Sequence, residues 1–252
     1  MNINRRRMLE GMAGLALCPL CAASGRAAEG PHWSYEGHGG PDNWGSLGAA
    51  NNVCKLGTQQ SPVDIASTVK AELPKLEIAW SKSADTIVNN GHTIQLNFTD
   101  GGSLKVGGDT YKLVQFHFHR PSEHLMDGKR SAMEVHFVHT AGPSALGVIG
   151  VMMTPGKANA VFNKIVSTMP AKEGPPVKAD PAIDPSALLP AGRVYVRYAG
   201  SLTTPPCAET VAWMVLTDPI EVAEADIAAF AKLYHDNARP AQKLNRRFLL
   251  RS

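Results

Sequence analysis

The chain has 252 residues, 44% of them hydrophobic and 6% aromatic, and carries a formal net charge of +3. This length supplies one sizeable hydrophobic core and allows at most two domains. Four basic residues and one acidic residue lie within the first 28 positions, so the remainder is electrically balanced and gives no electrostatic case for binding nucleic acid or an anionic membrane.

Residues 1–28 have the features of an export signal. Three arginines at 5–7 precede Met8-Leu9 and a Gly- and Ala-rich apolar run over 11–24, a pattern that resembles a twin-arginine signal. A membrane anchor is the weaker alternative, because a spanning helix needs about 20 apolar residues. We therefore expect a signal at 1–28, a folded domain at 29–252 and no stable membrane insertion.

The cysteines fit an exported protein. Cys18 and Cys21 lie in the signal, which leaves Cys54 and Cys207 in the folded domain. In an oxidising compartment these two can form a single disulfide that closes a long loop and so lowers the entropy of the unfolded chain. Two free buried thiols are the alternative.

The order of patterns along the chain predicts a β-rich domain. Residues 29–60 read as an irregular segment that Trp33, Tyr35 and Trp44 pin to the core. Short apolar-alternating runs follow, separated by Gly and Asp turns, and residues 171–185 read as a proline-rich surface loop. Helical spacing occurs at 159–167 and 224–234. The expected strands fall at 61–65, 75–80, 85–90, 93–98, 102–108, 111–119, 131–139, 146–153, 193–202 and 209–220.

We therefore expect a mostly β (α+β) single domain. It should be built on a large, predominantly antiparallel twisted central sheet with short peripheral helices, since no repeat and no long linker divides the chain.

Histidines on adjacent predicted strands point to a metal site. In a strand, alternate side chains share a face, so His117 and His119 face the same way as Gln115, and His136 faces the same way as Glu134. If the two strands are neighbours, three imidazoles converge, as a tetrahedral zinc with an open fourth position requires. Such a zinc acidifies its bound water.

The remaining polar residues of this region refine the hypothesis. Gln115 and Glu134 each precede a proposed ligand by two residues and could accept the N–H of its other ring nitrogen. We interpret His124 and His139 as hydrogen-bonded core residues, and His235 as solvated. The spacing His117, His119, Glu123 also matches the metal motif of cupins, in which Glu123 would be a fourth ligand. The flanking glycines of that motif are missing, however, and these residues alone leave both kinds of metal site open.

Motifs along the whole folded domain resemble those of a known family. In order they are WSYEG, GPDNW, QSPVDI, NNGH, QFHFHRPSEH, MEVHFVH, GSLTTPPC and RPAQ. With these motifs the chain resembles an α-class carbonic anhydrase, specifically an exported bacterial one of periplasmic or secreted location. The resemblance implies reversible hydration of carbon dioxide to bicarbonate and a proton by zinc-bound hydroxide, with ester hydrolysis as a side activity.

The resemblance also implies roles for individual residues. His117, His119 and His136 would bind Zn²⁺, supported respectively by Gln115, by the backbone carbonyl of Asn245 and by Glu134. Thr203 would accept the proton of the hydroxide while donating its own to Glu123. An apolar wall would hold carbon dioxide, formed by Val138, Val148, Leu202, Val211 and Trp213.

Proton transfer and covalent structure follow the same resemblance. His92 in NNGH would carry the proton to buffer, because an imidazole pKa near 6.5 suits exchange at neutral pH. The polar path to it would be lined by Tyr35, Asn90, Gln95 and Thr204. Cys54 and Cys207 occupy the positions of a disulfide in exported members.

Some features depart from the animal pattern or leave alternatives open. Arg120 follows the second histidine where animal enzymes carry an aromatic residue, and the short spacing to Glu123 implies a shorter loop at the rim of the site with the metal ligands unchanged. A binding domain of this family that has lost its metal would be expected to lack a ligand histidine. The sequence leaves homodimer formation undecided.

Overall fold

The computed structural model describes residues 32–142 and 145–252. The predicted export signal at 1–28 lies outside these residues. None of the described helices is long and apolar enough to cross a membrane.

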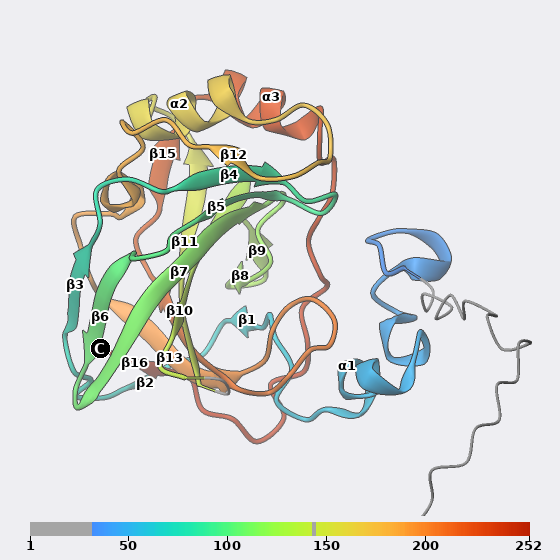
Figure 1. Cartoon of the computed structure of the whole chain (residues 1–252). Helices are drawn as coiled ribbons and strands as arrows, with labels where there is room; N and C mark the ends of the chain where they lie inside the picture. The colour runs from blue at the N-terminus through green and yellow to red at the C-terminus, as the bar shows by residue number, and fades with distance from the viewer. Residues whose placement is uncertain (1–31, 143–144) are drawn as a thin grey trace, which may run out of the picture. The chain divides into compact units, whose positions relative to one another are not determined.

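Thirteen strands form one twisted sheet, which confirms the predicted fold class (Figure 1). Along its main path the strand order is β12-β4-β5-β7-β10-β11-β14-β13-β16-β2, with β3, β6 and β15 paired at its sides. Most pairings are antiparallel; β11 is parallel to β14 and β15, and β16 to β2. The bounds are β2 Val69–Lys70, β3 Leu76–Trp80, β4 Thr86–Asn89, β5 Ile94–Asn97, β6 Gly102–Val106, β7 Asp109–His119, β10 Met133–Thr140, β11 Leu146–Pro155, β12 Val177–Lys178, β13 Tyr195–Gly200, β14 Val211–Leu216, β15 Ile220–Val222 and β16 Leu250–Arg251.

Three short strands form a second, separate sheet. It consists of β1 Asp64–Ile65, β8 Leu125–Met126 and β9 Lys129–Arg130. The predicted proline-rich loop is more ordered than expected: β12 within it pairs with β4, and a 3₁₀ helix, η4, follows at Pro185–Leu188. Such a two-residue edge strand is too short to leave a periodicity signal.

Two short helices, α2 Ala160–Thr168 and α3 Glu224–Ala231, pack against each other beside β4, β12 and β15 (Figure 1). Asn159 caps α2 by accepting hydrogen bonds from the backbone N–H groups of Val161 and Phe162. Helix α3 ends three residues earlier than predicted. The backbone N–H groups of Lys232 and Leu233 bond to carbonyls three residues back, which tightens the last turn and ends the helix.

The N-terminal segment folds as predicted, with little regular structure. It contains the 3₁₀ helices η1 Gly37–Gly39, η2 Trp44–Ser46 and η3 Ala49–Asn51, and one turn of helix, α1 Val53–Leu56. Trp33 and Tyr35 pack edge-on against the fully buried Trp44, with ring centroids 5.4 and 5.8 Å away. Cys54 of α1 forms a disulfide with Cys207, 153 residues along the chain, which confirms that pairing.

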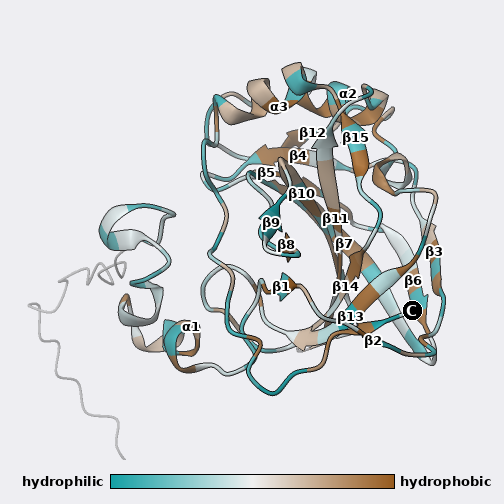
Figure 2. Ribbon diagram, turned by 180° about the vertical axis from the view of Figure 1, so that it is seen from behind, coloured by the Kyte–Doolittle hydropathy of each residue, from teal (hydrophilic) through white to brown (hydrophobic). Residues whose placement is uncertain are grey.

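The main core lies on the sheet face opposite the histidines. Phe116, Phe118 and Phe137 are fully buried there, in the odd-even alternation that β7 and β10 impose. Figure 2 shows hydrophobic residues along the central strands of the sheet, interrupted by hydrophilic ones. The phenylalanine side of each strand therefore provides the packing that fixes where the histidine side points.

His139 is a hydrogen-bonded core residue, as predicted. It is fully buried, its Nδ1 lies 3.1 Å from the Gly147 carbonyl oxygen, and its Nε2 lies 3.0 Å from Trp80 Nε1. Since an indole nitrogen only donates, Nε2 accepts and the proton sits on Nδ1. Burial lowers the pKa of His139 to about 4, only partly opposed by backbone hydrogen bonds.

This lowered pKa predicts acid destabilisation. His139 takes up a proton near pH 6.5 in the unfolded chain and only near pH 4 in the folded chain. Its contribution to the free energy of unfolding is therefore fully present above pH 6.5 and decreases by about 3 kcal/mol as the pH drops to 4. Urea unfolding of the wild type and of His139→Gln at pH 7 and pH 4.5 measures this contribution of His139 to the free energy of unfolding. The variant should be less stable at pH 7 but lose less on acidification, and equal losses would contradict the assignment.

Candidate metal centre

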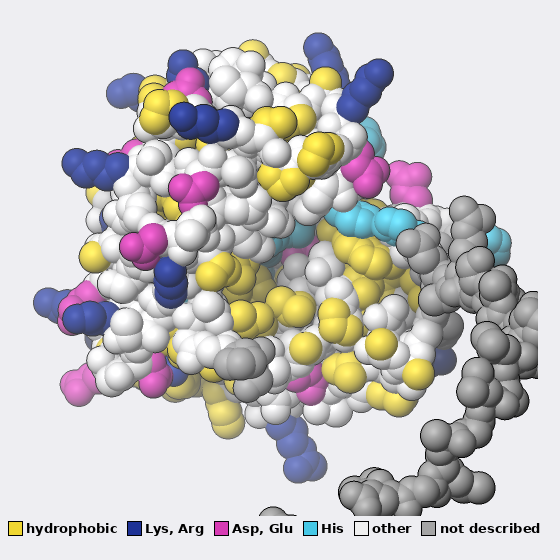
Figure 3. All heavy atoms as spheres, in the orientation of Figure 1, with side chains coloured by type: hydrophobic (Ala, Val, Ile, Leu, Met, Phe, Trp, Pro, Cys, Tyr) yellow, Lys and Arg dark blue, Asp and Glu magenta, His cyan; other side chains and the backbone are white. Residues whose placement is uncertain are grey.

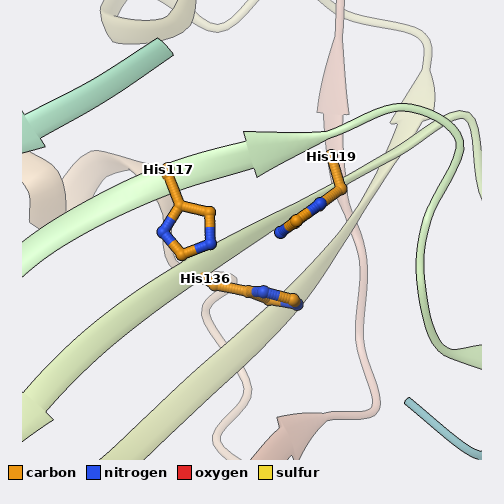
Figure 4. Close-up of side chains that lie close together, drawn as sticks. All are labelled: His117, His119 and His136. Carbon is orange, nitrogen blue, oxygen red and sulfur yellow. The ribbon is translucent and has the colours of Figure 1, made fainter. Parts of the chain in front are cut away.

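The pairing of β7 with β10 brings the three predicted histidines together. His117 lies directly opposite His136, and His119 opposite Glu134, in the antiparallel register. Ring centroids are 5.0 Å apart for His117 and His119, and 4.6 Å for His119 and His136. One ring nitrogen of each lies within 4.8 Å of the others, and Figure 4 shows the three rings turned toward a common point.

Each histidine is held by its second ring nitrogen. Nδ1 of His117 lies 2.8 Å from Oε1 of Gln115, and Nε2 of His136 lies 2.8 Å from Oε1 of Glu134. These contacts are the ones predicted for Gln115 and Glu134. They fix each ring and leave its other nitrogen facing the common point.

The predicted support of His119 by Asn245 is wrong. Nδ1 of His119 lies 2.8 Å from the backbone carbonyl oxygen of Asn237. Asn245 is exposed, and its side chain donates to the carbonyl of Thr58. A backbone acceptor leaves no side-chain signature, so only spacing could have found it: Asn237 stands two residues before the RPAQ motif that begins at Arg239.

Glu134 anchors a larger polar network than the sequence indicated. Its two oxygens accept from the ring of His124 at 2.7 Å and from the backbone N–H groups of Glu123 and His124. The other nitrogen of His124 lies 2.6 Å from the hydroxyl of Tyr198. His124 is thus a buried, hydrogen-bonded residue, as predicted, and it orients Glu134.

Burial and charge set the protonation of the three rings. Burial, helped by the neighbouring imidazoles, holds the pKa of His117 well below its usual value, and burial also lowers that of His119. For His136 burial is outweighed by the Glu134 carboxylate, and its pKa is raised. Burial likewise disfavours charge on Glu134, yet His124 and His136 bring its pKa well below the usual range. The site therefore has a fixed carboxylate behind the imidazoles, and burial favours the neutral form of His117 and His119.

Two buried polar atoms without hydrogen-bond partners in the described part of the chain indicate which kind of ligand the site can bind. Nε2 of His119 and Oε2 of Glu123 are buried without a hydrogen-bond partner among the described residues. A buried polar atom without a partner costs free energy, and a cation bound to the three imidazole nitrogens would remove that cost for His119. The donor set, three imidazoles with a second hydrogen bond each, is the one that zinc prefers.

Glu123 lies beside the histidines, and a backbone hydrogen bond from Arg239 fixes its carboxylate. Its Oε1 accepts the backbone N–H of Arg239 at 2.8 Å, and its Oε2 lies 3.5 Å from Nε2 of His119. The predicted hydrogen bond from Thr203 is absent from this structure, because Oε2 faces the imidazoles and the second oxygen is engaged by Arg239. Thr203 is itself buried in the loop after β13.

Predicted wall residues form one apolar cluster next to the histidines. Val148, Val211 and Trp213 belong to a buried cluster against which Val138 and Leu202 pack. The Trp213 ring lies 4.9 Å from that of His136. Figure 3 shows a hollow in this face, with histidine and carboxylate atoms at its floor and hydrophobic side chains along its lower wall.

Comparison with known proteins agrees with this geometry. A family model described as eukaryotic-type carbonic anhydrase matches residues 39–252. The chain belongs to the α-class carbonic anhydrases. A carbonic anhydrase of Klebsiella pneumoniae is 42% identical over 222 residues, covering 87% of this chain and 90% of that protein. One of Pectobacterium carotovorum is 38% identical over 245 residues, covering 96% of this chain and all of that protein.

A solved structure supports the same assignment for the fold. The α-carbonic anhydrase of Thermovibrio ammonificans, in complex with the inhibitor sulfanilamide, superposes with a TM-score of 0.84 at 42% identity, covering 87% of this chain and 98% of that one. Membership of this family makes the protein a carbonic anhydrase, a lyase.

In this carbonic anhydrase the residues predicted for proton transfer lie at three places. Gln95 is opposite His117 across the β5–β7 pair, and Asn90 donates to Gln95 at 3.5 Å. Farther out, the ring of His92 stacks on Trp33 at 3.7 Å, with Tyr35 at 6.4 Å. Thr204 lies in the Thr203 loop, where its carbonyl accepts from the backbone of Cys207.

Proposed function

We propose that this carbonic anhydrase is a zinc enzyme that reversibly hydrates carbon dioxide to bicarbonate and a proton. The observation that carries the proposal is the set of three converging imidazoles, two of them buried and that of His117 half-buried, each fixed through one nitrogen and free at the other. His117 and His119 would bind the ion through Nε2, and His136 through Nδ1. When bound, zinc supplies a Lewis acid that makes water nucleophilic near neutral pH.

The residues around the histidines would orient the nucleophile and exclude competing acceptors. Glu123 is fixed by Arg239 and keeps one oxygen toward the site. We propose that Thr203 donates to that oxygen in the working enzyme, so that a lone pair of the Thr203 hydroxyl accepts the proton of the nucleophile. In this arrangement Glu123 is a positioning residue and not a metal ligand.

The apolar cluster suits a substrate without strong hydrogen-bonding groups. Carbon dioxide would lie against Val138, Val148, Leu202, Val211 and Trp213, which offer contact area without directional bonds. An ester carbonyl could meet the same nucleophile, which is our basis for proposing a side esterase activity.

His92 would move the proton from the site to the solvent. It is half-buried, and its pKa is lowered by burial first and by nearby His32 second. A lowered pKa keeps the imidazole neutral, and able to accept a proton, to a lower pH than a free histidine. Tyr35, Asn90, Gln95 and Thr204 would line the water-filled path.

Replacing His92 tests this role. We expect His92→Ala to slow turnover in weak buffer by about 10-fold or more, since general acid–base groups contribute roughly 10²–10⁴-fold. Small imidazole buffers should restore the rate. Stopped-flow hydration with buffer titration measures both effects, and His235→Ala provides an exposed-histidine control. Unchanged turnover of His92→Ala in weak buffer would remove the shuttle role.

Two other functions are less well supported. A cupin would use Glu123 as a ligand, but the sheet, the family match and the Arg239 contact of Glu123 do not favour it. A metal-free binding domain would not need three intact, pre-oriented imidazoles. Metal analysis separates all three: one zinc per chain supports our proposal, iron or manganese the cupin, and no metal the binding domain. Because the Thermovibrio enzyme is complexed with sulfanilamide, inhibition by this compound provides a second test.

We also propose that the protein is exported, to the periplasm or beyond. The Cys54–Cys207 disulfide supports an oxidising compartment. Export of a variant with Arg5→Lys and Arg6→Lys should be strongly reduced if the signal is of the twin-arginine type. Undiminished export would show that another route is used.

A further inference from the structure

Arg239 is a buried guanidinium that links the disulfide to Glu123. It is only 2% exposed. Nη2 donates to the carbonyl oxygen of Cys54 at 3.0 Å, and Nη1 to Oε1 of Gln60 at 2.9 Å and to the carbonyl of Ser61 at 2.8 Å. Its backbone N–H holds Oε1 of Glu123 at 2.8 Å. One residue thus contacts both the bridge segment and the site.

Gln60 extends this connection to the second cysteine. Its Nε2 donates to the carbonyl oxygen of Cys207 at 3.1 Å, while its Oε1 accepts from Arg239. The backbone N–H of Cys207 in turn bonds to the carbonyl of Thr204 at 2.9 Å, which closes the loop that carries Thr203. Arg239 and Gln60 together therefore bind the carbonyls of both half-cystines.

The charge of Arg239 makes its position depend on these acceptors. Among the described residues it forms no ion pair with a carboxylate. Burial lowers its pKa to about 10, so it remains charged at neutral pH. Its stabilisation comes from carbonyl oxygens and from the Trp44 ring, 5.5 Å from Cζ. If those carbonyls move, the buried cation must move with them to stay hydrogen-bonded.

We propose that Arg239 is a positioning residue that couples the Cys54–Cys207 disulfide to the placement of Glu123 and of the Thr203 loop. The inference rests on the function proposed above, in which Glu123 orients Thr203. It assigns to the disulfide a role in turnover that is separate from its role in stability, and predicts that reduction slows the folded, metal-loaded enzyme.

The test compares oxidised and reduced enzyme with and without the coupling residue. A phosphine such as tris(carboxyethyl)phosphine reduces the bridge: the S–S bond breaks, two thiols form, and the phosphine takes oxygen from water to become its oxide. A phosphine avoids adding thiolates, which bind zinc. The kcat/KM for hydration is measured at a low temperature, chosen so that both forms are folded by circular dichroism and contain equal amounts of zinc by metal analysis.

We expect reduction of the wild type to lower kcat/KM about 10-fold, since small displacements near a reacting group have effects of this order or larger. Arg239→Lys with the bridge intact should cause a similar loss. Reduction of Arg239→Lys should then cost less than a further factor of about two, because the connection is already broken. Arg247→Lys is the matched control: Arg247 also donates to backbone carbonyls, those of Gln60, Ala199, Lys243 and Leu244, but it hydrogen-bonds neither half-cystine, nor Glu123, nor the side chain of Gln60. It should keep the full effect of reduction.

Each result decides the proposal. Reduced wild-type enzyme with full zinc and unchanged kcat/KM would overturn it, as would losses that simply multiply in Arg239→Lys. If that variant does not fold, Gln60→Met replaces it in the same comparison; it removes the Cys207 arm together with the Gln60 bonds to Arg239 and Glu209, and leaves the bond from Arg239 to Cys54 in place. Absence of zinc or of hydration activity in oxidised wild type would instead refute the proposed function, so the two failures are distinguishable.

Discussion

Replacing His119 by alanine or glutamine should abolish both metal binding and carbon dioxide hydration. His119 supplies one of three converging nitrogens and is fully enclosed, so no solvent group can take its place. Loss of a hydrogen-bonded partner of a metal ligand already costs roughly 10–100-fold in affinity or activity, and loss of the ligand itself should cost more. We expect less than one tenth of an equivalent of zinc after dialysis.

The measurement needs one control for folding and one for zinc bound by histidines outside the site. His119→Gln preserves most of the buried volume, and circular dichroism with thermal unfolding reports whether the sheet is intact. His235→Ala removes an exposed histidine and should retain one zinc and full activity. A folded His119→Gln that keeps both zinc and turnover would show that the three imidazoles are not the metal centre.

Removing the disulfide should produce the largest loss of stability. The bridge closes a loop of 153 residues, for which the chain-entropy model gives about 5 kcal/mol at 25 °C. A loss of that size is a large fraction of the stability of an ordinary domain. The double variant Cys54→Ser, Cys207→Ser should therefore unfold at much lower urea concentration than the oxidised wild type.

The unfolding experiment also separates the effect of breaking the disulfide from the effect of removing the two sulfur atoms. Reduced wild type retains both sulfur atoms in the aromatic cluster with Trp44 and should show nearly the same loss as the double serine variant. A loss below about 1 kcal/mol in both would mean that the unfolded chain is already restrained without the bridge. A thiol titration of the unreduced mature domain, without Cys18 and Cys21, that finds two free groups would contradict the bridge itself.

Local sequence determined the strands and the two-sided character of the site. The alternation of His117 and His119 with Phe116 and Phe118 predicts one polar and one apolar face, because a strand has a period of two. The same alternation places Gln115 and Glu134 behind their histidines. These relations depend only on backbone geometry within a strand, so they could be predicted without knowing the fold.

Only tertiary structure decided which strands are neighbours and which distant groups complete the site. The register of His117 opposite His136 depends on pairing β7 with β10 across the connection that contains β8 and β9. The support of His119 by the carbonyl of Asn237, 118 residues away, is a backbone contact that no side-chain pattern encodes. The hold of Arg239 on Glu123 is of the same kind, which is why Asn245 was assigned in error and Arg239 was missed.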